Sequence, residues 1–108
     1  MNPEQQRIAI AEACGWTECQ LIKSYDGKQV PYGVAPNESP ILNETPDYLN
    51  DLNAMRHAEN YCLHNLLLWA TYRHLLLLIT SDGSGVPESA TAAQRAEAFL
   101  KTLNLWEN

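Results

Sequence analysis

Apolar residues recur at helical spacing near both ends of the chain, and each pattern begins with a recognisable cap. The first predicted helix extends from about Pro3 to Cys14, with Asn2 as its N-cap and Gly15 at the position where a positive φ ends it. Thr91 and Gln94 form a capping-box pattern at the start of the last predicted helix. The inner face of that helix holds Ala96, Phe99, Leu100 and Leu103.

A further helix is predicted to begin at Thr45-Pro46-Asp47, where an N-cap, a proline suited to the first turn and an acid that complements the helix dipole follow one another. Beyond it, Tyr61 to Ile79 is apolar on nearly every side, and continues as helix or breaks briefly and restarts. One side of this segment holds Leu63, Leu66, Leu67, Ala70, His74, Leu77 and Leu78.

A helix that is apolar all round is either central in a fold or covered by a partner. Because a domain of 108 residues cannot easily enclose a helix, we expect the chain to be a homo-oligomer that associates through one side of this segment. A strand over Leu75 to Thr80, which would complete a sheet, is the alternative.

Two short strands are predicted at Gln20–Tyr25 and Gln29–Val34, because they flank Asp26-Gly27, a dipeptide typical of tight hairpin turns. Pro31 lacks an N–H, so the second strand is expected at a sheet edge or in irregular structure. Ala35 to Glu44 shows no periodicity and is predicted as a loop of about ten residues, a length that favours a binding surface although a plain connector is more common.

Composition narrows the class of protein. The length predicts a single domain over residues 1–108, and the net charge of −6 argues against DNA or RNA as a partner, since phosphate binding needs a basic surface. Polar residues interrupt the apolar stretch too often for a membrane span. With three cysteines and no apolar leader at Met1, we expect reduced thiols and a cytoplasmic protein.

Three segments together resemble the phage ABA-sandwich domain, a family of small tailed-phage and prophage proteins. They are Ile8–Trp16, Pro46–Met55 and Ala90–Trp106. The resemblance implies an α+β fold, a small α/β/α sandwich in which about four helices flank a thin antiparallel sheet. It also implies a bacteriophage origin and the host cytoplasm, and it brings no activity and no catalytic residues.

The residues themselves predict no enzyme, no cofactor and no metal site. Cys14, Cys19, Cys62 and His64 lack the spacing of a zinc site, so buried thiols are the better interpretation, although a site assembled from distant segments stays open. The chain has no nucleophile motif, no paired carboxylates and no glycine-rich phosphate loop.

Residues that lie outside the apolar stripes are the candidates for ligand binding. Aromatic residues beside loops suit stacking on a base or a protein interface, and they can also simply cover the ends of a core. If the second and third helices pack antiparallel, Arg56 and His57 are expected to converge with Arg73 and His74 on one small anion. The alternative is that these residues are solvated helix tips or form interhelical salt bridges to Glu59 and Asp51. The predicted ligand-binding residues are Trp16, Tyr25, Lys28, Tyr32, Arg56, His57 and Arg95.

We therefore expect a non-enzymatic phage accessory protein that binds and sequesters a small nucleotide-like molecule with which the host signals infection. Two alternatives stay open: a module that inhibits a host protein by direct contact through its acidic surface, and a structural accessory of the virion.

Overall fold

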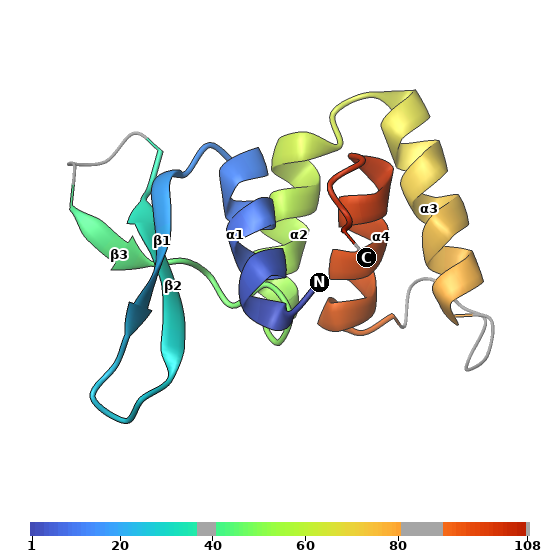
Figure 1. Cartoon of the computed structure of the whole chain (residues 1–108). Coiled ribbons are helices and arrows are strands. Elements are labelled where there is room, and N and C mark those ends of the chain that lie inside the picture. The colour runs from blue at the N-terminus through green and yellow to red at the C-terminus, as the bar shows by residue number, and fades with distance from the viewer. Residues whose placement is uncertain (37–40, 81–89, 108) are drawn as a thin grey trace.

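The computed structural model describes residues 1–36, 41–80 and 90–107. Four helices and a three-stranded antiparallel sheet make up this part of the chain, which confirms the predicted α+β class. In chain order the elements are α1 (Pro3–Ala13), β1 (Thr17–Lys23), β2 (Gln29–Val34), β3 (Leu42–Glu44), α2 (Leu52–Cys62), α3 (Leu66–Thr80) and α4 (Ala92–Thr102) (Figure 1).

The helices form a stack that begins at the sheet. Helix α1 packs against β1 and β2, α4 lies against both α1 and α2, and α3 lies beyond α4 at the far end (Figure 1). Among the described elements, α1 is the helix that contacts the sheet. The layers therefore differ from the expected sandwich in one respect, because the helices gather on one side of the sheet.

The strand order is β1-β2-β3, so β2 is the central strand and the expectation of an edge strand at Pro31 is wrong. The register of β2 with β3 continues from Tyr32–Glu44 to place Pro31 opposite Thr45, whose N–H donates to the Pro31 carbonyl at 3.0 Å. Proline cannot return the second bond of that pair, so the Thr45 carbonyl needs another donor.

Arg7 of α1 supplies that donor. Its guanidinium Nη2 donates to the Thr45 carbonyl at 2.5 Å and its Nε donates to the Pro46 carbonyl at 3.3 Å. The side chain is only 13% exposed. A residue distant in sequence thus satisfies the backbone where the proline cannot, and the contact also fixes α1 against the sheet.

Local capping signals predicted both ends of α1 and the start of α4. The capping boxes of Asn2 with Gln5 and of Thr91 with Gln94 are both present, and Gly15 has a φ of +95° as expected after α1. The long apolar segment breaks after Cys62 and restarts at Leu66, and the alternative of a strand over Leu75 to Thr80 is wrong because α3 runs to Thr80.

Two predictions in the middle of the chain are wrong. Helix α2 begins at Leu52 and not at Thr45, because Asp51 caps it by accepting from the N–H of Asn53 at 3.0 Å, while residues 48–50 form a turn. The expected loop over Ala35 to Glu44 contains β3, whose three residues are all exposed and carry no alternation. Residues 37–40 of that segment lie outside the described residues.

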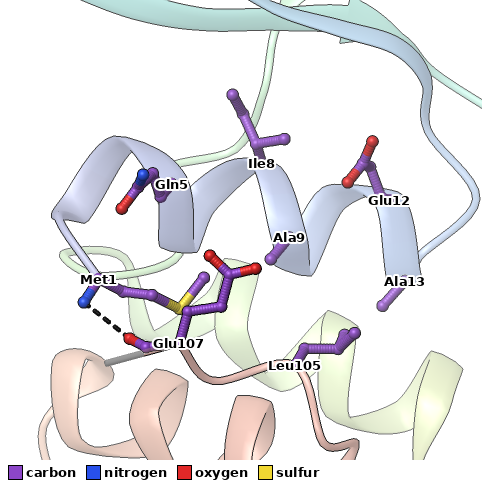
Figure 2. A pocket seen from close by; sticks show the side chains of 8 residues that line it. All are labelled: Met1, Gln5, Ile8, Ala9, Glu12, Ala13, Leu105 and Glu107. Carbon is purple, nitrogen blue, oxygen red and sulfur yellow. Dashed lines mark hydrogen bonds between the residues drawn. The ribbon is translucent and has the colours of Figure 1, made fainter.

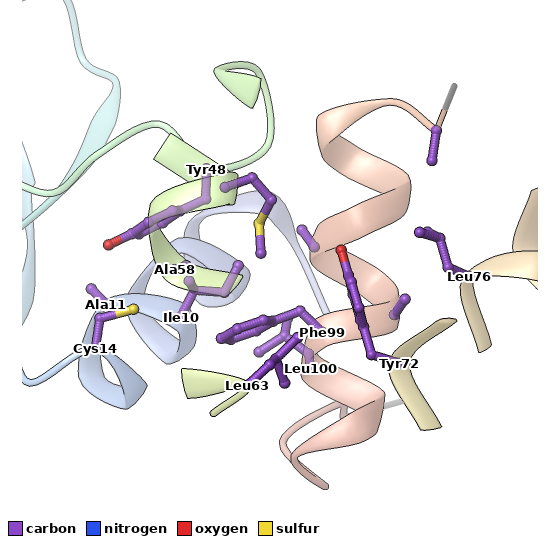
Figure 3. Close-up of a cluster of buried hydrophobic side chains, with 14 residues drawn as sticks. Ile10, Ala11, Cys14, Tyr48, Ala58, Leu63, Tyr72, Leu76, Phe99 and Leu100 are labelled. Carbon is purple, nitrogen blue, oxygen red and sulfur yellow. The ribbon is translucent and has the colours of Figure 1, made fainter. Parts of the chain in front are cut away.

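The core is centred on α4. Phe99 and Leu100 are fully buried, and they meet Ile10 of α1 and Tyr72 of α3 from opposite sides (Figure 3). Ala96 and Ala98 are fully buried as well, and small residues of this kind allow neighbouring helices to approach closely.

Arg7→Met tests the role of Arg7. The substitution leaves two carbonyl groups without their donor, so we expect the free energy of unfolding in urea to fall by about 1–3 kcal/mol. Arg56→Met is the matched control, because Arg56 is an exposed helical arginine, and it should change stability by less than about 0.5 kcal/mol. Equal effects of the two substitutions would show that the Arg7 contacts contribute nothing.

Candidate functional site

Helix α3 has one side buried against α4 and one side exposed. Its inner side places Tyr72 and Leu76 in the core, with Tyr72 1% exposed and edge-on to Trp69 at a centroid distance of 5.7 Å. The outer side carries four leucines, Leu66, Leu67, Leu77 and Leu78, which are 87%, 76%, 44% and 57% exposed. We call these four residues the outer leucine surface.

The position of α3 is fixed from its start. Asn65 caps the helix, since its side-chain oxygen accepts from the N–H of Leu68 at 2.8 Å and its carbonyl accepts from the N–H of Trp69. The α3–α4 contact is the most extensive between any two described helices, and α3 makes no comparable contact with α1 or α2. The outer leucine surface therefore faces away from the rest of the described chain.

The outer leucine surface consists of two pairs of leucines, one near each end of the helix. Leu66 and Leu77, and likewise Leu67 and Leu78, are eleven positions apart, which is about three turns and returns each pair to the same side. Ala70 and His74 are exposed between the two pairs. The helix contains no acidic residue, in a chain whose net charge is −6.

A second feature is a small pocket between the end of α1, the second half of α2 and the segments after β2 and β3. We call it the aromatic pocket; its volume is about 240 Å³ and its lining is Cys14, Trp16, Ala35, Pro36, Pro46, Tyr48, His57 and Tyr61. The residues of α2 on this lining, His57 and Tyr61, belong to the second half of the helix, and Pro46 and Tyr48 come from the segment after β3. The Tyr48 side chain is buried at its back, and burial raises the pKa of its hydroxyl well above the usual range. The lining is apolar and aromatic, with His57 as its one basic side chain.

Arg56 and Arg95 come together in a different pocket, of about 280 Å³, with Glu59, Asn60 and Trp69. Arg95 donates to the Glu59 carboxylate at 3.1 Å, and their side chains are 11% and 4% exposed. The buried hydroxyl of Tyr72 has no hydrogen-bond partner within the described residues; burial raises the pKa of Tyr72, and the Glu59 carboxylate raises it further. Arg95 is thus engaged in an ion pair that joins α2 to α4.

The remaining predicted ligand-binding residues lie apart from these pockets. Tyr25 is fully exposed near the tip of the β1–β2 hairpin, Lys28 is exposed in the same turn, and Tyr32 is half-buried in β2. The expected meeting of Arg56 and His57 with the two basic residues of α3 does not occur, because α3 packs on α4 and not on α2.

A larger cavity, of about 490 Å³, runs along α1 beside the segment after α4 (Figure 2). The amino group of Met1 donates to the Glu107 carbonyl at 2.9 Å, and the carboxylates of Glu12 and Glu107 lie on the same cavity. Two carboxylates disfavour an anionic ligand there. Sequence reasoning did not single out this cavity.

The described residues contain no group of three or more side chains placed to hold a metal ion. Cys14 and Cys62 do come together, 48 positions apart in sequence, with their Sγ atoms 3.8 Å from each other. Within the same residues no helix is both long and apolar enough to cross a bilayer.

Comparisons of the chain with protein-family models, with curated proteins and with solved structures each found no match. The resemblance to the phage ABA-sandwich domain therefore stays a prediction that rests on three sequence segments.

The Glu59–Arg95 pair should be sensitive to the loss of one partner. In Arg95→Met the Glu59 carboxylate stays buried without its counter-charge, so we expect a loss of about 3 kcal/mol in urea unfolding. The double variant Glu59→Met/Arg95→Met should recover much of this loss, because it leaves no buried charge.

Lys101→Met is the control for the Glu59–Arg95 pair. It breaks the Glu97–Lys101 pair, whose side chains are 32% and 39% exposed, and should cost less than about 1 kcal/mol. A double variant no more stable than Arg95→Met would contradict the assignment of the loss to a stranded carboxylate.

Proposed function

We propose that this chain is a non-enzymatic protein-interaction module that assembles with a second copy of itself through the outer leucine surface. The observation that supports the proposal is the exposure of four leucines on one side of a helix whose other side is buried. Exposed large apolar side chains gathered on one side of a helix commonly mark an interface.

The arrangement of the leucines favours a second copy over an unrelated partner. In a two-fold symmetric contact, residue i meets residue j and residue j meets residue i. An antiparallel pair of α3 helices with its axis near position 72 brings Leu67 opposite the partner's Leu78, and Leu66 opposite the partner's Leu77. Ala70 lies near the crossing point, where its small side chain allows close approach.

Charge and size set the strength of this contact. Two copies that each have a net charge of −6 repel one another. Contact through α3 reduces this repulsion locally, because the helix has no acidic residue. A helix of 15 residues is about 22 Å long, so one helix pair buries less than the roughly 800 Å² per partner of a standard interface. We therefore expect a dissociation constant on the order of 10 μM.

In the setting that the resemblance implies, the dimer acts in the cytoplasm of an infected host. Its acidic surfaces outside α3 then remain accessible to a basic host protein, which electrostatic attraction would steer toward it. This is the direct-contact form of an accessory protein, and it needs no catalytic residue.

Exchanging the facing leucines for charges tests the proposed register. Leu67→Glu should weaken dimerisation at least tenfold in sedimentation equilibrium, because it places a carboxylate in an apolar contact. Leu67→Glu/Leu78→Lys should restore association, because each introduced carboxylate then faces an introduced ammonium group of the other copy across the two-fold axis.

The matched control is Ile41→Glu, which charges a residue that is 63% exposed and lies outside α3; it should leave the dimer unchanged. A wild-type protein that sediments as a monomer at several hundred micromolar would overturn the proposal. Equal weakening by the single and double variants would contradict the antiparallel register.

A second candidate function has its own support. The aromatic pocket contains Trp16 and His57, two of the predicted ligand-binding residues, together with Tyr48 and Tyr61. Its volume of about 240 Å³ is below the range of drug-sized sites and suits one planar ring system, such as a nucleobase. The sequestering of a nucleotide-like host signal would use this pocket, with the phosphate outside it.

Titration with adenosine 5′-monophosphate, followed by tryptophan fluorescence, tests the second candidate. We expect saturable quenching whose dissociation constant His57→Ala raises about fivefold or more, since stacking on a base contributes about 1–3 kcal/mol. Tyr25→Ala is the control, because Tyr25 is fully exposed on the hairpin. Binding that is lost equally in the control, or is absent with several nucleotides, would contradict this candidate.

A further inference from the structure

Cys14 and Cys62 form a pair of thiols held at the ends of two helices. Cys14 is the C-cap of α1 and Cys62 is the last residue of α2. Their Sγ atoms are 3.8 Å apart, within the distance of a sulfur hydrogen bond, and the Cys62 thiol also donates to the Ala13 carbonyl at 3.3 Å. Three interactions thus hold two distant parts of the chain at one point: the thiol contact, the bond to Ala13, and the packing of α1 against α2.

A disulfide requires the two sulfur atoms to approach to about 2.05 Å, which is about 1.8 Å closer than they are. Both residues lie at helix ends, where fewer backbone hydrogen bonds resist a small shift.

We propose that Cys14 and Cys62 are a peroxide-sensitive thiol pair that closes into an intramolecular disulfide. In the first step the Cys62 thiolate attacks one oxygen of the peroxide, the O–O bond breaks, and the leaving hydroxide takes a proton to become water. In the second step the Cys14 sulfur loses its proton and attacks the Cys62 sulfenic acid, the S–O bond breaks, and a second water leaves. Two thiols and one hydrogen peroxide thereby give one disulfide and two waters.

The environments of the two sulfur atoms indicate which of them reacts with the peroxide first. Cys62 is partly exposed whereas Cys14 is only 4% exposed, so an oxidant reaches Cys62 first. The hydrogen bond from Cys14 lowers the pKa of the Cys62 thiol, while that same contact and burial raise the pKa of Cys14. We therefore assign the attack on the peroxide to Cys62, the more accessible of the two thiols, and the resolving step to Cys14.

Closure of this bond would affect both stability and the neighbouring pocket. It would join residues 48 positions apart, and a loop of that length strongly restricts the unfolded chain, so we expect the melting temperature to rise by about 10 °C. Cys14 also lines the aromatic pocket, so oxidation would alter the pocket wall. The chemistry of the pair does not depend on either proposed function.

The experiment treats the full chain with a few equivalents of hydrogen peroxide and follows intact mass and peptide maps. We expect the wild-type protein to lose the mass of two hydrogen atoms, with a Cys14–Cys62 linked peptide that dithiothreitol separates. Cys19→Ser is the matched control and should behave as the wild type. Cys14→Ser should instead accumulate a sulfenic acid at Cys62, detected as a dimedone adduct.

Two results would overturn the proposal. One is a wild-type chain that gains oxygen at its cysteines, or remains reduced, and never forms the linked peptide. The other is a disulfide that involves Cys19 or joins two chains. Because the wild-type measurement decides between these outcomes, the test holds even if the Cys14→Ser variant folds poorly.

Discussion

The packing around α4 is the interaction on which the rest of the structure depends. Phe99 and Leu100 are fully buried there, and each contributes about 1.5–3 kcal/mol by leaving water, more than the exposed Glu97–Lys101 pair on the same helix. Helix α4 contacts α1, α2 and α3, whereas α3 has its main contact with α4 alone. If α4 were displaced, the core would open and α3 would lose its support.

The positions of the candidate functional features follow from this arrangement. Because α4 covers only the inner side of α3, the outer leucine surface stays exposed within the described residues. The Glu59–Arg95 pair ties α2 to the same helix, which holds α2 where its end meets α1. That meeting point contains both the aromatic pocket and the Cys14–Cys62 pair. Ligand binding, self-association and thiol oxidation are thus separate proposals for different faces of one stack of helices.

Local signals in the sequence predicted the ends of α1 and the start of α4, but they misplaced the start of α2, which is capped by Asp51 and not by Thr45. The caps at Asn2 and Thr91, and the apolar side of α3 that stays exposed, could be found from spacing alone. The central place of Pro31 could not, because Arg7, distant in sequence, replaces its missing donor. For the same reason the aromatic pocket and the thiol pair escaped prediction, since each joins segments that only the packing of α1 on α2 brings together.

The central claim is that α3 packs on α4 with its inner side and on a second copy of the chain with its outer side. An NMR dilution series on the unmodified chain tests this claim most directly. As the concentration rises from about 10 μM to 1 mM, a range that spans the expected dissociation constant, methyl shifts of Leu66, Leu67, Leu77 and Leu78 should change together. Shifts in the three strands should stay constant. Shifts that are constant throughout α3, or that change only in the sheet, would contradict the account.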